Sequence, residues 1–296
     1  MPRSSPEPVA LAWVPGAGPV DIEPLDLGLL NQSYRVTRAG RAYALRIAAP
    51  DSSVLGIDRE WECRIGARAA AAGVGPPISR CEPGAGILVT EWVAGRAWSP
   101  GEVRHPDGID AMARLLGRVH GLSDLPRPVR AMRPGDWIAR YSEALNRTGR
   151  VPRGDTAALR CAADRVLRAT AAHPPQAALC HGDLHRLNVS VGIEGLLLFD
   201  WEYAHLSDPY WDLAGWVANN DEPEAFGVDL LASYLRRRPD AREAARLRQF
   251  AWLYDYVCLL WSELYLGLDR GGADGVAARA AQLALRLRAP PCGPAG

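Results

Sequence analysis

The sequence contains no lysine: all 34 basic residues of the 296-residue chain are arginine. Together with the abundance of Ala, Gly and Pro, this favours a GC-rich genome as the cause, rather than a binding role. It also excludes a lysine as the residue that binds a phosphate group, so arginine must serve wherever such a cation is needed. The formal net charge is +0, which argues against a nucleic-acid or membrane-surface role driven by bulk charge.

Long apolar runs are also missing, so no transmembrane span is predicted. The first ten residues, MPRSSPEPVA, lack the apolar core of a signal peptide. The six cysteines show no CxxC or zinc-ligand spacing, which predicts reduced, mostly buried thiols in a cytoplasmic protein. They lie at positions 63, 81, 161, 180, 258 and 292.

One segment, CHGDLHRLNVSVGIEGLLLFD, carries the clearest chemical signal. His181, Asp183 and Asn188 follow the order H-x-D-x-x-x-x-N, and the apolar run LLLF then leads to Asp200. Phosphoryl transfer needs such groups: an Asp facing the acceptor hydroxyl, and an Asn carbonyl and a second Asp as magnesium ligands. The alternative is a polar loop between buried strands, with its carboxylates acting as turn or cap residues.

This segment resembles the catalytic loop of the aminoglycoside phosphotransferase/choline kinase superfamily, small-molecule relatives of the protein kinases, with Gly182 where protein kinases have Arg. The resemblance covers roughly Leu25 to Gly267. It implies an α+β, protein kinase-like, two-lobe fold. Residues 1–95 would form a small β-rich nucleotide-binding lobe, and residues 96–296 a larger, mainly helical catalytic and acceptor-binding lobe. It also implies ATP and Mg²⁺ as cofactors.

Periodicity predicts the elements of both lobes. Residues 1–23 are expected to be loosely ordered, apart from a short apolar patch. The N-lobe elements are a hairpin from Gly28 with a turn at Ala39-Gly40, a helix over 58–72, and strands over 78–81 and 87–92. The C-lobe helices are expected over 109–122, 136–145, 156–171, 209–220, 223–237, 241–266 and 273–287.

The hairpin carries the first nucleotide-binding candidates. Gly28, Asn31 and Ser33 stand at its mouth, where protein kinases place a glycine-rich loop over the phosphates; a plain hairpin is the alternative. Arg46 occupies the place of the phosphate-contacting lysine of kinases, and its guanidinium suits bidentate contacts with phosphate oxygens. An ordinary exposed strand arginine is the other interpretation.

A glutamate on the following helix should hold this arginine. Glu62 is preferred over Glu60, because choline kinase-like proteins place the residue at a fixed distance before a Gly-Pro pair, here Gly75-Pro76. A solvated surface glutamate is the alternative.

The segment of Glu91, Trp92 and Val93 resembles the hinge between the lobes. There, backbone groups would bind an adenine edge.

The catalytic and metal assignments follow from the resemblance. Asp183 would orient the acceptor hydroxyl and receive its proton, with His181 as the second catalytic candidate. Asn188, Asp200 and Glu202 are the metal candidates. Glu202 could instead belong to the acceptor pocket or support the ligands.

Asp212 resembles the family's buried aspartate that braces the loop. Few residues separate Asp200 from the next helix start at Asp208. This leaves no room for an activation loop, so a small-molecule acceptor is expected.

The acceptor is predicted from acidic and aromatic residues. Between positions 200 and 235 there is no arginine, and the acidic residues there are Asp200, Glu202, Asp208, Asp212, Asp221, Glu222, Glu224 and Asp229. The aromatic candidates are Trp201, Tyr203, Trp211, Trp252, Tyr256 and Trp261. Carboxylates and aromatic faces suit an organic cation, although each aromatic taken singly is better explained as core.

Choline kinase-like proteins resemble this pattern. A choline- or ethanolamine-type alcohol is therefore predicted first, thiamine second and an aminoglycoside third.

Two classes of function remain open from the sequence. One is an active ATP-dependent small-molecule kinase, monomeric or dimeric, with no nucleic-acid or membrane partner. The other is an inactive relative that binds a metabolite or a protein. The presence of all the catalytic-loop residues favours the first.

Overall fold

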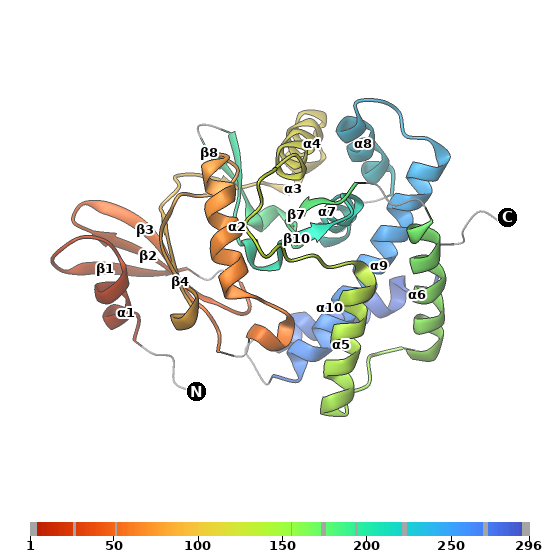
Figure 1. The fold of residues 1–296 in the computed structure, drawn as a ribbon, viewed down its shortest axis with the longest axis horizontal. Coiled ribbons are helices and arrows are strands. Elements are labelled where there is room, and N and C mark those ends of the chain that lie inside the picture. The colour runs from red at the N-terminus through yellow and green to blue at the C-terminus, as the bar shows by residue number, and fades with distance from the viewer. Residues whose placement is uncertain are drawn as a thin grey trace. The chain divides into compact units, whose positions relative to one another are not determined.

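The computed structural model describes residues 5–25, 28–50, 52–154, 156–172, 176–192, 195–220, 224–268 and 272–291. The chain divides into two compact units (Figure 1). The first combines Met1–Ala97 with Ser190–Tyr203, and the second combines Trp98–Val189 with Ala204–Gly296. The predicted boundary after residue 95 lies close to this division. The return of residues 190–203 to the first unit was not anticipated.

The first unit is built on a five-stranded sheet of order β1-β2-β3-β5-β4, antiparallel throughout. Ala39 and Gly40 join β2 to β3, and both have positive φ (50° and 75°), as a type I′ hairpin turn requires. The strands are β1 (Val20–Leu25), β2 (Gln32–Arg38), β3 (Arg41–Ile47), β4 (Ile78–Glu82) and β5 (Ile87–Glu91).

Residues 6–13 and 20–25 form regular secondary structure, and the expectation of loose structure was wrong for them. Ala10 of helix α1 (Pro6–Trp13) and Val14, which follows the helix as its C-cap, pack into the core of the sheet. Strand β1 pairs along β2 as an edge strand, a position that tolerates its Pro24. Both elements owe their order to the sheet rather than to local propensity, which is why the Pro- and Gly-rich sequence did not reveal them.

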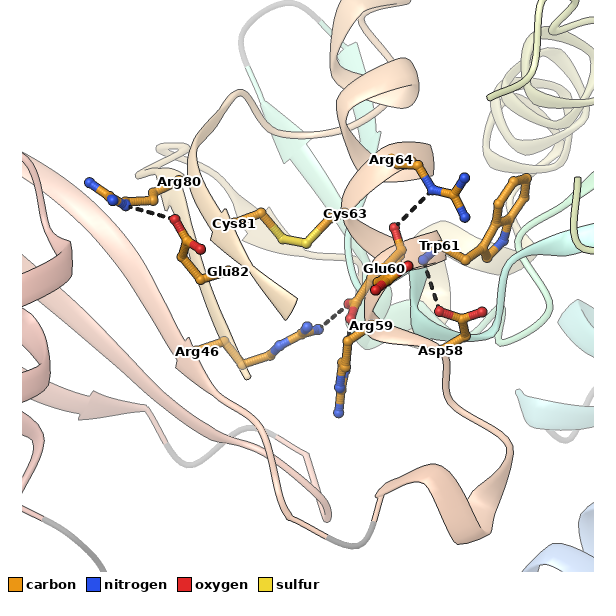
Figure 2. The surroundings of a disulfide bond; sticks show 11 residues. Arg46, Asp58, Arg59, Glu60, Trp61, Cys63, Arg64, Arg80, Cys81 and Glu82 are labelled. Carbon is orange, nitrogen blue, oxygen red and sulfur yellow. Dashed lines mark hydrogen bonds and ion pairs between the residues drawn. A yellow bond between two sulfur atoms is a disulfide. The ribbon is translucent and has the colours of Figure 1, made fainter. Parts of the chain in front are cut away.

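Helix α2 (Arg59–Ala71) begins at Asp58, whose side chain accepts a hydrogen bond from the Trp61 amide. It was predicted over 58–72. A disulfide between Cys63 and Cys81 joins α2 to β4 (Figure 2). The prediction of reduced cysteines is therefore wrong for this pair. The two residues are 18 positions apart and meet through helix–sheet packing, which no short sequence spacing encodes. One argument for a cytoplasmic location is thereby lost.

The remainder of the first unit is a small three-stranded sheet of order β6-β8-β9. Its strands are β6 (Arg96–Ala97), β8 (Val189–Gly192) and β9 (Gly195–Leu198). The Leu198 amide donates to the Val74 carbonyl at 2.9 Å. A short 3-10 turn, η4 (Trp201–Tyr203), then packs against α2. This path places Asp200 and Glu202 in the same unit as Arg46.

The second unit is mainly helical, and α9 (Ala241–Leu266) packs against α5, α6, α7 and α10. A capping box between Asp240 and Glu243 starts α9. The two-stranded sheet pairs β7 (Ala178–Cys180) with β10 (His205–Ser207). The other helices are α3 (Pro100–Arg104), α4 (Pro106–His120), α5 (Pro134–Thr148), α6 (Thr156–Ala171), α7 (Tyr210–Asn219), α8 (Glu224–Leu235) and α10 (Ala273–Arg286).

The predicted mixed architecture, a β-rich N-terminal part and a helical C-terminal part, is confirmed. The bounds of α6 and α9 agree with the prediction, and the other helix ends differ by a few residues. Within the described residues, no helix combines the length and apolar character needed to span a bilayer.

Candidate active site

In the first unit, Arg46 of β3 reaches Glu62 of α2. One guanidinium nitrogen lies 2.5 Å from Glu62 Oε1 and 2.8 Å from Asp200 Oδ1. The register pairs Arg46 with Ser33 of β2, so the strand fixes where the guanidinium leaves the sheet. The predicted partner is thus Glu62 and not Glu60. The role of the pair in binding a nucleotide stays a prediction.

Arg59, at the start of α2, is a residue that the sequence reasoning missed. Its Nη1 donates to Glu62 Oε2 and Glu202 Oε2, each at 2.8 Å, and its Nη2 donates to Asn31 Oδ1 at 3.0 Å. Figure 2 shows Arg46 on β3 and Arg59 on α2 near the disulfide. The signal in the sequence was its place three residues before Glu62, where helix side chains meet.

Arg46, Arg59, Glu62, Asp200 and Glu202 will be called the charged cluster. They are largely buried, with side-chain exposures of 13%, 12%, 3%, 31% and 5%. Two guanidinium groups face three carboxylates, so the formal charge of the ionised cluster is negative. A buried surplus charge of this kind favours the arrival of a cation.

The pKa shifts of these residues show how burial and the neighbouring charges oppose each other. Burial opposes the charge of Arg46, but Glu62 and Asp200 outweigh it and raise the guanidinium pKa. Burial likewise opposes ionisation of Glu62, yet the charge and hydrogen bond of Arg46 lower its pKa. In Glu202, by contrast, burial prevails over Arg46 and the pKa is raised. Of Glu62 and Glu202, the folded protein compensates the negative charge of Glu202 less.

The carboxylates also have the spacing of a cation site. One oxygen each from Glu62, Asp200 and Glu202 lies within 4.8 Å of the others, as ligands around one hard divalent cation do. Asp200 has φ of 63°, a left-handed conformation that non-glycine residues adopt mostly at constrained sites. Oxygen donors and surplus negative charge therefore fit Mg²⁺.

The predicted nucleotide-side loop lies next to this cluster. Asn31 Nδ2 donates to Glu202 Oε2 at 3.0 Å, which connects the loop to the acids. Gly28 has φ of 80° and lies exposed, while Ser33 lies on β2 opposite Arg46. The structure thus places Asn31 and Ser33 near the predicted phosphate-binding arginine.

The predicted hinge residues follow β5. The amides of Glu91 and Trp92 donate to the Pro77 and Ala42 carbonyls at 2.9 and 3.1 Å, so they are engaged in the sheet. The binding of an adenine edge by the backbone of Glu91, Trp92 and Val93 stays a prediction.

In the second unit, residues 181–188 form the candidate catalytic loop between β7 and β8. The buried carboxylate of Asp212 on α7 accepts hydrogen bonds from the His181 amide at 2.7 Å and the Gly182 amide at 2.9 Å. The predicted bracing by Asp212 is present. His181 is fully buried, and its Nδ1 accepts from the Asp183 amide at 3.4 Å, so its ring helps to shape the loop.

Asn188 and Asp183 are held together within this loop. Asn188 Nδ2 donates to the Asp183 carbonyl at 2.9 Å and to Asp183 Oδ2 at 3.4 Å. The amide nitrogen is thereby used, and the Asn188 Oδ1 oxygen is the group left to meet a cation. The Asp183 side chain is 32% exposed, so a small molecule can reach it.

His120 contacts both Asp212 and Tyr234. His120 Nε2 is 3.2 Å from Asp212 Oδ2, and His120 Nδ1 is 2.8 Å from the Tyr234 hydroxyl. Burial opposes ionisation of Asp212, but the hydrogen bond and charge of His120 bring its pKa below the usual range. An ionised Asp212 can only accept, so His120 Nε2 is the donor of this contact.

The aromatic candidates are distributed unevenly. Trp261 is half-buried and stacks on Tyr265 with ring centroids 5.2 Å apart. The other aromatics of α9 are buried, including Trp252 and Tyr256, which pack together. Trp211 is buried against Tyr254, whose hydroxyl donates to the Gly182 carbonyl.

Trp201 is buried in the first unit, where its Nε1 donates to the Leu198 carbonyl. Tyr203 is half-buried there. The predicted contacts of these aromatics with an acceptor stay predictions.

Part of the predicted acidic field falls outside the structural description. Asp221 and Glu222 lie outside the described residues, as does the side chain of Glu224. Asp208 is paired with Arg246, which removes its charge from the field. The acidic argument therefore depends chiefly on the charged cluster and Asp183.

Fold and site define a kinase-like phosphotransferase, and comparison with known proteins agrees. The phosphotransferase enzyme family matches residues 21–250, and the chain belongs to this family. This confirms the predicted superfamily and the predicted class of enzyme, a small-molecule phosphotransferase. A comparison with curated proteins gives no match.

Similar solved structures include a choline/ethanolamine kinase family protein from Mesorhizobium loti, 27% identical, with a TM-score of 0.75, covering 93% of this chain and 89% of that chain. The choline kinase LicA from Streptococcus pneumoniae is 21% identical, with a TM-score of 0.77, and the match covers 90% of this chain and 93% of that chain. The structure of LicA in complex with AMP is 19% identical, with a TM-score of 0.75, and the match covers 92% of this chain and 93% of that chain.

Proposed function

We propose that this protein transfers the γ-phosphate of ATP to the hydroxyl of a small organic cation of the choline or ethanolamine type. The observation that carries the chemistry is the candidate catalytic loop, in which Asn188 and the Asp212 carboxylate hold Asp183 in place. An accessible carboxylate on a fixed loop is what the orientation of an acceptor hydroxyl requires.

Each unit supplies a distinct set of groups in this proposal. In the first, Arg46 contacts the phosphates, Glu62 orients Arg46, and the backbone of residues 91–93 binds the base. Asp200 and Glu202 would hold Mg²⁺, which neutralises phosphate charge when bound. In the second, Asp183 orients the acceptor hydroxyl and accepts its proton late, because the transition state is loose. The AMP complex of the similar LicA supports a nucleotide site.

The acceptor class is supported by two observations. The choline/ethanolamine kinase family protein from Mesorhizobium loti is similar over 93% of this chain. Trp261 offers a half-buried aromatic face on α9, one turn beyond Cys258 and two beyond Tyr254, the residue that contacts the catalytic loop. An aromatic face of this kind can hold a quaternary ammonium group.

The test is turnover with ATP and Mg²⁺ against a panel of alcohols, with phosphorylated product identified by ³¹P NMR. The panel contains choline, ethanolamine, thiamine, an aminoglycoside and a neutral sugar. The proposal expects the highest kcat/KM for choline or ethanolamine. Preference for the neutral sugar would contradict the cation argument, and absence of turnover with every alcohol would favour an inactive binding protein.

Trp261 provides the matched variants. Trp261→Ala should raise the acceptor KM by about tenfold, because a cation–π contact contributes about 1–2 kcal/mol, and leave the KM for ATP unchanged. Trp261→Phe keeps an aromatic face and should retain most of the affinity. Equal KM values in all three proteins would exclude Trp261 from the acceptor site.

A further inference from the structure

Arg59 makes contacts that the proposed function does not account for. Its guanidinium joins three side chains from separate elements: Glu62 on α2, Glu202 on η4 and Asn31 in the loop before β2. Arg46 already supplies a cation for Glu62. A second buried arginine at the same carboxylate is therefore not needed to hold Arg46 in place.

Arg59 differs from Arg46 in that it contacts both Glu202 and Asn31, which also contact each other. Glu202 Oε2 accepts from Arg59 Nη1 at 2.8 Å and from Asn31 Nδ2 at 3.0 Å. Asn31 Oδ1 accepts from Arg59 Nη2 at 3.0 Å. These contacts form a closed set of three side chains, so displacement of any one alters the hydrogen bonds of the other two.

We infer that Arg59 is a positioning residue that couples binding of the divalent cation to binding of the nucleotide phosphates, by linking Glu202 to Asn31. This inference rests on the proposed function, in which Glu202 would hold the cation, and on the predicted position of the loop of Asn31 over the phosphates. Its physical basis is linkage: groups that share hydrogen bonds favour one arrangement jointly, so fixing one lowers the cost of fixing the other.

The planar guanidinium suits this role. Nη1 contacts the two carboxylates, while Nη2 is directed to the amide of Asn31. A lysine ammonium is a single point and cannot present two nitrogens at this fixed separation. Arg59→Lys should therefore keep the charge of the cluster and lose much of the coupling.

The experiment measures the dissociation constant of ADP by calorimetry, with and without Mg²⁺ and without any acceptor. The coupling is the ratio of the two constants. In the wild-type protein Mg²⁺ should tighten ADP binding, and in Arg59→Gln this ratio should fall at least fivefold, with Arg59→Lys intermediate. Asn31→Ala should lower the ratio similarly. The double variant should lower it no further, because the two residues act as a unit.

Arg64→Gln is the matched control. Arg64 is on the same helix, but its Nε donates to the Glu60 carbonyl and its guanidinium lies 5.7 Å from the Trp61 ring centroid. Its loss removes the same charge from α2 and should leave the ratio unchanged. Thermal unfolding without ligand identifies any variant that fails to fold, and Asn31→Ala then still tests the coupling from the loop side.

The possible outcomes separate the two proposals. If Mg²⁺ tightens ADP binding equally in the wild-type protein, Arg59→Gln and Asn31→Ala, the inference about Arg59 is overturned and the proposed function stands. Additive losses in the double variant would also overturn it. If Mg²⁺ has no effect on ADP binding to the wild-type protein, the cation assignment of the proposed function fails first. Electron paramagnetic resonance of Mn²⁺ alone then reports whether the carboxylates bind a cation at all.

Discussion

The charged cluster of the first unit and the catalytic loop of the second hold their carboxylates by different interactions. In the cluster, carboxylates and guanidiniums contact one another, and negative charge exceeds positive charge. Beside the loop, the Asp212 carboxylate of α7 is contacted by two loop backbone amides and by His120. Both sites are buried, but only the second is electrostatically satisfied by the protein alone.

The pKa directions express the same contrast. Although burial opposes both charges, the partners of Asp212 lower its pKa, whereas burial prevails at Glu202 and raises its pKa. The folded protein therefore stabilises the ionised form of Asp212 and disfavours that of Glu202. In the proposed function, the loop would be arranged in advance for the acceptor, and the cluster would be arranged to receive a cation. The comparison can be tested by four changes, from the largest expected effect to the smallest.

Asp183→Asn should reduce kcat by about 10³-fold, because the loop would keep its shape but lose the group that orients the acceptor and accepts its proton. Rapid-quench or steady-state turnover measures the loss. The unfolding midpoint and the dissociation constant of ADP should stay at their wild-type values. Turnover retained in this variant would exclude Asp183 as the base.

Arg46→Ala should reduce kcat/KM for ATP by about 10²-fold, the scale of removing one donor that stabilises developing charge. Arg46→Lys should restore only part of it, since an ammonium cannot contact two oxygens as a guanidinium does. Glu62→Ala combined with Arg46→Ala should add little, because the residues act as a pair. Wild-type kinetics in Arg46→Ala would show that β3 does not bind the phosphates.

Asp212→Asn should lower the free energy of unfolding by about 2 kcal/mol at pH 7, the scale of hydrogen bonds to a charged group. The folded-state pKa of Asp212 lies below its ordinary value of 3.8, so its contribution is present above that pH. It is lost as the pH falls through the folded-state pKa. Urea unfolding from pH 7 downward should show the two proteins converging in acid. A constant difference across this range would contradict the assignment of charge.

Glu202→Gln should have the opposite effect and raise the free energy of unfolding at pH 7 without a divalent cation, because the folded protein disfavours the ionised form of Glu202. The folded-state pKa lies above the ordinary value of 4.5. The gain should therefore appear as the pH rises past that value and vanish below it. The same urea titration measures it, and destabilisation by this variant at pH 7 would remove the contrast between the two sites.

Much of the candidate site was visible in the sequence because its signals are local. The spacing of His181, Asp183 and Asn188 falls within one loop, and Arg46 and Glu62 could be placed from the strand and helix patterns around them. The helices α6 and α9 were predicted to their ends, because amphipathic periodicity is set by each helix itself. The family follows from these same motifs.

Other features depend on contacts between distant parts of the chain, and the sequence did not show them. Strand β1 is ordered by its pairing with β2, and Cys63 meets Cys81 only because α2 packs beside β4. Arg59 contacts Glu202, which is 143 positions away. A side chain's partners across such distances depend on packing geometry, whereas propensity and spacing act over a few residues. The sequence by itself determined the chemistry and the class of fold, and the tertiary structure decided which charges are compensated.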